Sequence, residues 1–150
     1  MRMPRKKTGA VRSKKKTIDG ITFASTLESY CYTSLKSKGI QFEYEGESIT
    51  LLPSFAPVGQ YYKSMLKKKE LVHVGMRKQL PITYTPDFIS HSSKFYIETK
   101  GFVPSQHTFH IRWKLFLKWL TDNNMSDYKV FLVKNQRQVD EAISIISNGQ

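Results

Sequence analysis

The sequence predicts a single α/β domain in which helices flank a central mixed β-sheet. Three segments carry apolar residues at helical spacing, five shorter segments are rich in β-branched and aromatic residues, and the two kinds are interspersed along the chain. A length of 150 residues suits one domain with a modest core, and a hydrophobic fraction of 39% is typical of a globular chain. The expected order of helix, strands, helix, strand, helix favours a layered architecture.

Basic residues are concentrated at the N-terminus. The formal net charge is +12, and residues 1–16 contain eight Lys or Arg and no acid, so we expect this tail to be disordered when free. The charge indicates a polyanionic partner, nucleic acid before an anionic membrane, and the tail would lie along phosphates. A solvated tail that only aids solubility is the alternative. The basic side chains concerned are Arg2, Arg5, Lys6, Lys7, Arg12, Lys14, Lys15 and Lys16.

The composition argues against several other classes of protein. No apolar run approaches the ~20 residues of a spanning helix, and the basic N-terminus lacks the apolar stretch of a signal peptide, so we expect neither a membrane partner nor a leader. Cys31 is the single cysteine, which fits a reducing compartment, and we expect a cytoplasmic protein. His107 and His110 can share a helix face, but no Cys/His cluster has the spacing of a zinc site.

The first helix is expected over residues 25–38. Ser25 and Glu28 match the Ser-x-x-Glu capping box, and Gly39 is a natural C-terminal stop. One face of this helix carries Leu27, Cys31, Ser34 and Leu35. Residues 40–45 then alternate apolar and polar side chains, which predicts a strand, and residues 47–52 continue it or pair with it. The residues of the first strand that should face the core are Ile40, Phe42 and Tyr44.

A basic insertion is expected around residues 53–80. Pro53, Pro57 and Gly59 break the strand pattern, and Glu70 is the only acid in the insertion. Its basic residues are Lys63, Lys67, Lys68, Lys69, Arg77 and Lys78. Tyr61 and Tyr62 lie beside this charge, as in surfaces that combine phosphate contacts with base stacking. An exposed loop or hairpin whose lysines protect a sheet edge is an equally good interpretation.

A hairpin is expected next, because residues 82–89 and 94–99 read as strands joined by a polar turn, with Pro86 as an irregularity. Side chains alternate along a strand, so Glu98 and Lys100 should share one face with Tyr96. The opposite face should bury Phe95, Ile97 and Thr99.

The C-terminal third predicts a helix over residues 106–120, a short buried strand over 128–133 and a last helix over 137–147. On the first of these helices, the predicted core face carries Phe109, Trp113, Phe116, Leu117 and Leu120, with Ile111, Leu115 and Trp119 beside it. The last helix should bury Val139, Ala142, Ile143 and Ile146.

The predicted hairpin can bring Asp87 beside Glu98. Two carboxylates that converge repel each other unless a cation lies between them, and oxygen ligands suit Mg²⁺ or Mn²⁺. Lys100 beside such an ion can position or deprotonate a water for phosphodiester hydrolysis. The simpler interpretation is an ion pair between Glu98 and Lys100 on an exposed strand.

Two blocks of the sequence resemble the PD-(D/E)XK nuclease superfamily and, more narrowly, the phage endonuclease I family of Holliday-junction resolvases. The first block covers residues 23–28 and 36–45. The second joins Tyr-Thr-Pro-Asp-Phe at 84–88 to Glu-Thr-Lys-Gly at 98–101. The resemblance covers a little over a quarter of the chain, in the order of the family. It implies a restriction-endonuclease-like core and a Mg²⁺-dependent endonuclease that cuts branched DNA, especially four-way junctions, in the host cytoplasm if the gene is a phage gene.

The resemblance also implies roles for individual residues. Asp87 and Glu98 would hold the metal, the Thr99 carbonyl would add an oxygen, and Lys100 would orient the attacking hydroxide. Glu28 matches a glutamate that completes the metal site in the family, whereas its own sequence context predicts a residue that caps its helix. Two alternatives remain: a related nuclease that cuts duplex or single-stranded DNA, and a basic DNA-binding protein without catalysis.

A two-fold homodimer is also expected, since a four-way junction offers two equivalent strands and symmetric dimers are the commonest oligomers. In the resembled family the region matching residues 47–78 bridges two subunits. If this carries over, Glu28 of one chain would complete the site of its partner.

Overall fold

The structure, a computed structural model, describes residues 14–65, 67–75, 77–101 and 107–149. Its helices are α1 (Thr26–Ser37), α2 (His107–Asp122) and α3 (Gln136–Asn148). Its strands are β1 (Lys16–Ile18), β2 (Ile21–Phe23), β3 (Glu43–Tyr44), β4 (Ile49–Leu52), β5 (Tyr62–Met65), β6 (Lys68–His73), β7 (Ile82–Tyr84), β8 (Phe88–Ser90), β9 (Phe95–Thr99) and β10 (Lys129–Val133).

A mixed sheet lies at the centre, as predicted. Its strand order is β10-β9-β8-β3, with β9 and β10 parallel and the other pairs antiparallel. Strands β8 and β9 form the predicted hairpin around a turn at residues 91–94, and Phe88 lies opposite Ile97. The predicted mixed α/β class is therefore confirmed.

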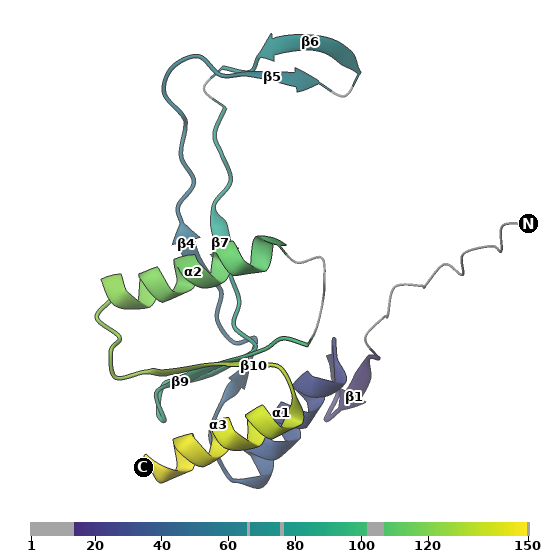
Figure 1. The fold of residues 1–150 in the computed structure, drawn as a ribbon, viewed down its shortest axis with the longest axis vertical. Helices are drawn as coiled ribbons and strands as arrows, with labels where there is room; N and C mark the ends of the chain where they lie inside the picture. The colour runs from purple at the N-terminus through teal and green to yellow at the C-terminus, as the bar shows by residue number, and fades with distance from the viewer. Residues whose placement is uncertain (1–13, 66, 76, 102–106, 150) are drawn as a thin grey trace, which may run out of the picture.

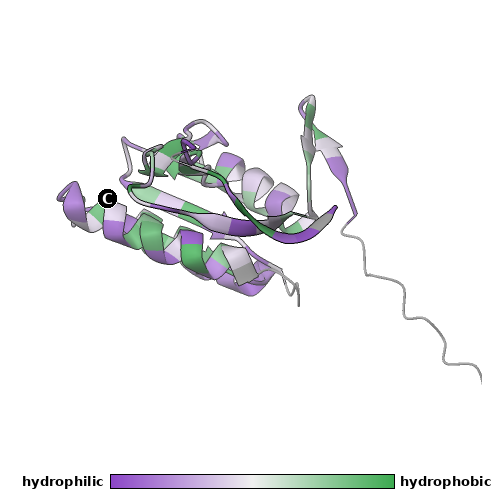
Figure 2. Cartoon of the chain, turned by 90° about the horizontal axis from the view of Figure 1, so that it is seen from above, coloured by the Kyte–Doolittle hydropathy of each residue, from purple (hydrophilic) through white to green (hydrophobic). Residues whose placement is uncertain are grey.

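Helices cover both faces of this sheet (Figure 1). Phe95 and Ile97 of β9 pack with residues of α1 and α3, whereas Tyr96 packs with Phe116 of α2 on the other face. Both faces of β9 are thus buried, although the sequence predicted a core on only one of them. Hydrophobic and hydrophilic residues alternate along the helices, as expected for helices that cover a core on one side (Figure 2).

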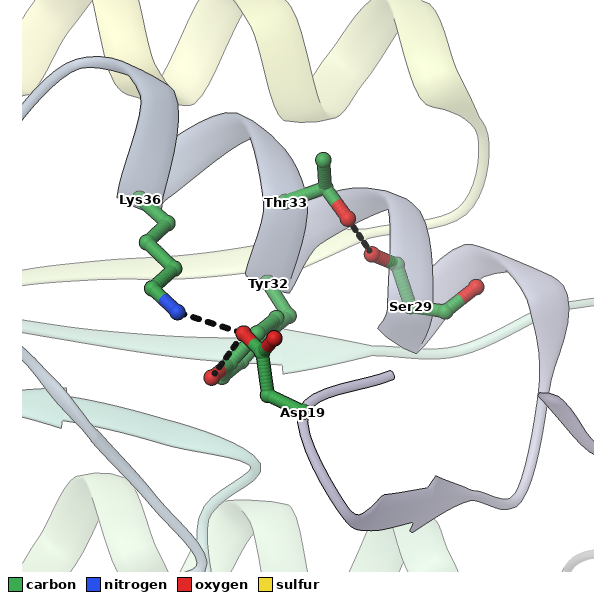
Figure 3. A network of polar contacts seen from close by, with 5 residues as sticks. All are labelled: Asp19, Ser29, Tyr32, Thr33 and Lys36. Atoms are coloured by element: carbon green, nitrogen blue, oxygen red, sulfur yellow. Dashed lines mark hydrogen bonds and ion pairs between the residues drawn. The ribbon is translucent and has the colours of Figure 1, made fainter. Parts of the chain in front are cut away.

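Helix α1 has the predicted caps. The Glu28 backbone N–H donates to Ser25 Oγ at 3.2 Å, and Gly39 follows the helix with a φ of +67°. Cys31 and Leu35 are buried on its inner face, as expected. A contact that the sequence analysis missed ties α1 to the β1–β2 hairpin: Asp19, in the turn, accepts a hydrogen bond from Tyr32 and pairs with Lys36 (Figure 3).

The N-terminal boundary differs from the prediction by a short margin. The tail was expected to include Lys16, but this residue begins β1 and lies opposite Phe23. Asp19 and Gly20 have φ values of +52° and +77°, which is the left-handed pair of a two-residue hairpin turn. The predicted disorder of residues 1–13 lies outside the described residues.

Two strand predictions need correction. Residues 82–89 form two strands, β7 and β8, which separate at Thr85–Asp87 and belong to different sheets. The strand expected over residues 40–45 is limited to β3, although Ile40, Phe42 and Tyr44 pack against the core as predicted. Strand β4 pairs with β7 rather than with β3, because the chain turns away after Gly46.

The described residues of the segment 49–84, which are 49–65, 67–75 and 77–84, form an extended β-ribbon, and we call this segment the arm (Figure 1). Strands β4 and β7 make its base, a Phe55–Gln79 bridge continues it, and the β5–β6 hairpin makes its outer end. The insertion therefore contains a hairpin, as one of the two interpretations predicted, but within the described residues β5 and β6 pair only with each other and protect no edge of the central sheet.

The C-terminal elements agree closely with the sequence. All four residues predicted for the inner face of α3 are buried, and α2 buries Phe109, Phe116 and Leu120. Leu117, predicted for the same face of α2, is 41% exposed, because it lies at the edge of the contact with the sheet. Strand β10 is only partly buried, since it forms an edge of the sheet.

Candidate active site at the end of the central hairpin

The break between β7 and β8 places Asp87 beside Glu98. Pro86 at this break has no backbone N–H to contribute to a strand ladder. The β8–β9 register then sets Asp87 opposite Glu98, one step beyond the Phe88–Ile97 pair. The hairpin inferred from the sequence thus brings together the two carboxylates that it was expected to join.

Asp87 is held by Thr99. The backbone N–H and the hydroxyl of Thr99 both donate to Asp87 Oδ2, at 2.8 and 2.7 Å. Among the described residues, no hydrogen bond reaches the other oxygen, Oδ1. Burial raises the pKa of Asp87 to about 6, the charges of Glu28 and Glu45 add to this rise, and the Thr99 hydrogen bonds oppose it.

Glu98 is 7% exposed and accepts a hydrogen bond from the Tyr84 hydroxyl at Oε2, 2.6 Å away. Burial and the charge of Asp87 raise its pKa to about 7, while the Tyr84 hydrogen bond and the positive charge of Lys100 oppose the rise. The charge of Asp87 therefore disfavours the ionised form of Glu98, as expected for neighbouring buried carboxyls.

Lys100 lies near Glu98 but does not form a simple ion pair with it. Its Nζ atom is 4.3 Å from the centroid of the Phe109 ring, a cation–π distance, and its backbone N–H donates to the Val133 carbonyl. Within the described residues, Lys100 and Glu98 form no salt bridge at 4.0 Å or less. The structure thus does not contain the direct ion pair that the simpler interpretation of Glu98 and Lys100 requires.

A cavity of about 500 Å³ opens at this end of the hairpin. Glu98 and Lys100 line it together with Arg112 of α2. Another cavity, of about 670 Å³, lies between Tyr32, Tyr44 and His91 and contains neither Asp87 nor Glu98. In the smaller cavity an anionic substrate would meet Glu98, a lysine and an arginine, whereas Asp87 lies beside Glu98 and is not among the lining residues.

Glu28 caps its own helix and also influences Asp87, so it has features of both roles considered for it, the helix cap and the site residue. Its Oε2 accepts hydrogen bonds from the Ala24 backbone N–H at 3.1 Å and from the Tyr44 hydroxyl at 2.8 Å, so it supports its own helix start. Its charge also contributes to the raised pKa of Asp87. Glu28 thus lies close enough to Asp87 of its own chain to influence its charge, and its expected role in a partner's site stays a prediction.

We expect Glu28→Ala to lower the free energy of unfolding by about 2 kcal/mol, because it removes a cap interaction and leaves the Tyr44 hydroxyl without its acceptor. Glu28→Gln keeps an acceptor oxygen and should cost less than about 1 kcal/mol. Urea denaturation of the two variants measures the difference. Equal losses in both variants would contradict the hydrogen-bonding role.

The residues fit a divalent cation through two carboxylates. In the part of the chain that the structure describes, no group of three or more His, Cys, Asp or Glu side chains is arranged to hold a metal ion. Mg²⁺, however, commonly uses one or two carboxylates and takes its other ligands from waters and phosphate oxygens. Asp87 Oδ1 and the Glu98 carboxylate provide such a pair. Thr99 orients Asp87 through its N–H and hydroxyl, and the contribution expected of its carbonyl stays a prediction.

Three residues of the site were not singled out from the sequence. Tyr84 belongs to the resemblance block but was given no role, and it is the hydrogen-bond donor to Glu98. Glu45 reaches Asp87 because its backbone N–H donates to the Asp87 carbonyl at 2.9 Å, which joins the end of β3 to β8. Arg112 of α2 lines the cavity, and nothing in the sequence singled it out. Only the tertiary packing of α2 brings it to the cavity.

The predicted DNA-contacting residues lie away from the carboxylates. Lys67, Lys69, Arg77 and Lys78 are exposed on the arm, Lys68 belongs to β6, and Lys14, Lys15 and Lys16 are exposed at the start of the described chain. Arg2, Arg5, Lys6, Lys7 and Arg12 lie outside the described residues. His110 is exposed on α2.

Comparison with known proteins yields one family. A family model described as a protein of unknown function (DUF1064) matches residues 8–135. No curated protein and no solved structure matches the chain. No helix within the described residues has the length and apolar character needed to cross a membrane.

Proposed function

The chain belongs to the DUF1064 family, and we propose that it is a metal-dependent DNA endonuclease of the PD-(D/E)XK type. One observation carries the proposal: Asp87 and Glu98 meet at the open end of the β8–β9 hairpin, each with a raised pKa, and Lys100 lines a cavity together with Glu98. Burying two carboxyls side by side opposes folding, so a structure that keeps them together indicates a functional use.

The residues have separate tasks in this proposal. Asp87 and Glu98 hold a Mg²⁺ ion, for which Mn²⁺ can substitute, with Thr99 fixing the orientation of Asp87. When bound, the ion would supply Lewis-acid stabilisation of the phosphate and a water of lowered pKa. Lys100 orients the attacking hydroxide and is kept extended over Phe109. Arg112 neutralises phosphate charge at the other side of the cavity.

The proposed substrate is branched DNA, in particular a four-way junction, by the resemblance of the Tyr84–Phe88 and Glu98–Gly101 blocks to junction resolvases. We propose a homodimer, since each chain provides one centre and a junction has two equivalent strands. By the same resemblance, Glu28 of one chain would complete the site of Asp87, Glu98 and Lys100 in its partner. Buried Cys31 is compatible with a reducing compartment such as the cytoplasm.

The test compares cleavage of a labelled four-way junction with cleavage of its separate duplex and single-stranded arms, with and without Mg²⁺. We expect Mg²⁺-dependent nicks near the branch of the junction and little cleavage of the arms. Equal cleavage of junction and arms would indicate a nuclease of broader substrate range. Binding of both substrates without any cleavage in Mg²⁺ or Mn²⁺ would overturn the enzymatic proposal in favour of a DNA-binding protein.

A further inference from the structure

We propose that the arm, residues 49–84, binds the duplex DNA that flanks the cleaved site, with the β5–β6 ribbon lying in the major groove. This inference rests on the proposed function for its DNA substrate but concerns a different surface. If the arm binds in this way, the substrate is DNA with an extended duplex beside the cleaved site. A strand that only reaches the carboxylates would not be enough.

The arm starts at the candidate active site and leads away from it. Strand β7 at its base ends at Tyr84, whose hydroxyl donates to Glu98. From this base the ribbon continues through the Phe55–Gln79 bridge to β5 and β6, well outside the body of the domain (Figure 1). At ~3.3 Å per residue, a strand from Leu52 to Met65 reaches up to roughly 40 Å, the length of about 12 base pairs.

The outer ribbon packs on nothing else within the described residues. All residues of β5 are exposed, and Leu71 of β6 is 72% exposed. In the register of the hairpin, Tyr62 lies opposite His73 and Ser64 opposite Leu71, so Tyr62 and Leu71 share one face. A two-stranded ribbon with both faces in water is marginally stable by itself, which indicates a surface that is completed by a partner.

Charge identifies that partner as a polyanion. Residues 53–80 contain six Lys or Arg and a single acid, Glu70. Exposed Lys63, Lys67 and Lys69 lie on and between β5 and β6, where they can reach phosphates on either side of a groove. Two such ribbons brought together in a dimer would place like charges against each other, which opposes a second copy as the partner.

The geometry also fits the major groove. This groove, ~12 Å wide, admits a two-stranded ribbon in undistorted B-DNA, whereas ribbons that bind the ~6 Å minor groove do so in complexes that deform the duplex. The face with Tyr62 and Leu71 would contact base edges and thymine methyl groups, and the lysines would contact the backbone. Phosphate contacts fix position without sequence information, so the lysines of the arm provide affinity and orientation for DNA of any sequence.

The test measures the affinity for four-way junctions with arms of about 8 or about 25 base pairs in EDTA, in which no strand is cut. We expect wild-type protein to prefer the long-armed junction and Lys63→Gln/Lys69→Gln to lose this preference. The slope of log K against log salt on the long-armed junction should fall by about 2 in this variant, one unit per lost lysine contact. Wild-type protein should protect guanine N7 atoms in the flank from methylation, and the arm variant should not.

Lys38→Gln/Lys129→Gln removes the same charge from exposed positions on the body and is the matched control. It should keep the preference for long arms. Cleavage that is absent in every protein, while wild type still prefers the long-armed junction, would reject the proposed function and not the arm. The inference is overturned if the arm variant keeps the preference for long arms. It is also overturned if wild-type protein does not protect the N7 atoms. A change of oligomeric state in light scattering without a change in DNA affinity overturns it as well, because that result would assign the arm to a second copy.

Discussion

Glu98→Gln is expected to reduce the rate of DNA cleavage by at least ~10³-fold while DNA affinity stays the same or increases. The glutamine keeps an oxygen that accepts the Tyr84 hydrogen bond, so the buried side chain retains its packing and its partner. It loses the negative charge through which a divalent cation is held. Loss of about 4 kcal/mol of transition-state stabilisation corresponds to this factor.

Asp87→Asn and Lys100→Ala should abolish cleavage for different reasons. Asp87→Asn removes the second carboxylate, and Lys100→Ala removes the group that orients hydroxide while leaving both carboxylates to bind metal. Isothermal titration with Mn²⁺ separates the two cases, since only the carboxylate variants should lose metal binding. Glu141→Gln is the charge-matched control, because Glu141 lies on the surface of α3 with Arg137 as its partner. Wild-type turnover in either carboxylate variant would show that the centre has been assigned to the wrong residues.

Much of the fold could be predicted from local sequence signals. The capping pair Ser25–Glu28 and the stop at Gly39 define α1, since both depend only on neighbours along the helix. The periodicity of α3 identified all its buried residues, because one amphipathic face meets one sheet face. The opposition of Asp87 and Glu98 followed from the alternation of a strand and the length of the turn.

Other features depend on tertiary structure. Nothing local in residues 82–89 determines that β7 leaves the central sheet to pair with β4, and this pairing is what creates the arm and brings Tyr84 to Glu98. Glu45 and Arg112 reach the site through the ends of β3 and α2, which are distant from Asp87 in sequence. The Asp19–Gly20 turn is different: the dipeptide is a strong hairpin signal that the sequence analysis did not use.

The raised pKa values of the two carboxyls also predict how stability depends on pH. The pKa of Glu98 is raised from its ordinary 4.5 to about 7, and that of Asp87 from 3.8 to about 6. Between pH 4 and 7 the folded chain therefore binds more protons than the unfolded chain, so the free energy of unfolding falls as pH rises. The stability is fully present below pH 4 and is lost as pH passes through about 7. The loss due to Glu98 is about 3 kcal/mol, at ~1.4 kcal/mol for each pKa unit.

The free energies of unfolding of wild type and Glu98→Gln, measured by urea denaturation in EDTA, should therefore change differently with pH. Between pH 4 and pH 8 the stability of the variant should rise by about 3 kcal/mol relative to that of wild type. Mg²⁺ at 100 times its Kd should restore ~2.7 kcal/mol to wild type at pH 8 and much less at pH 5, where Glu98 is protonated. It should add little to Glu98→Gln at either pH, while Glu141→Gln follows wild type throughout. This measurement needs no DNA and no cleavage. Equal stabilisation of wild type and Glu98→Gln by Mg²⁺ would place the cation away from Asp87 and Glu98, and parallel pH profiles in EDTA would show that the two buried carboxyls do not oppose each other's charge.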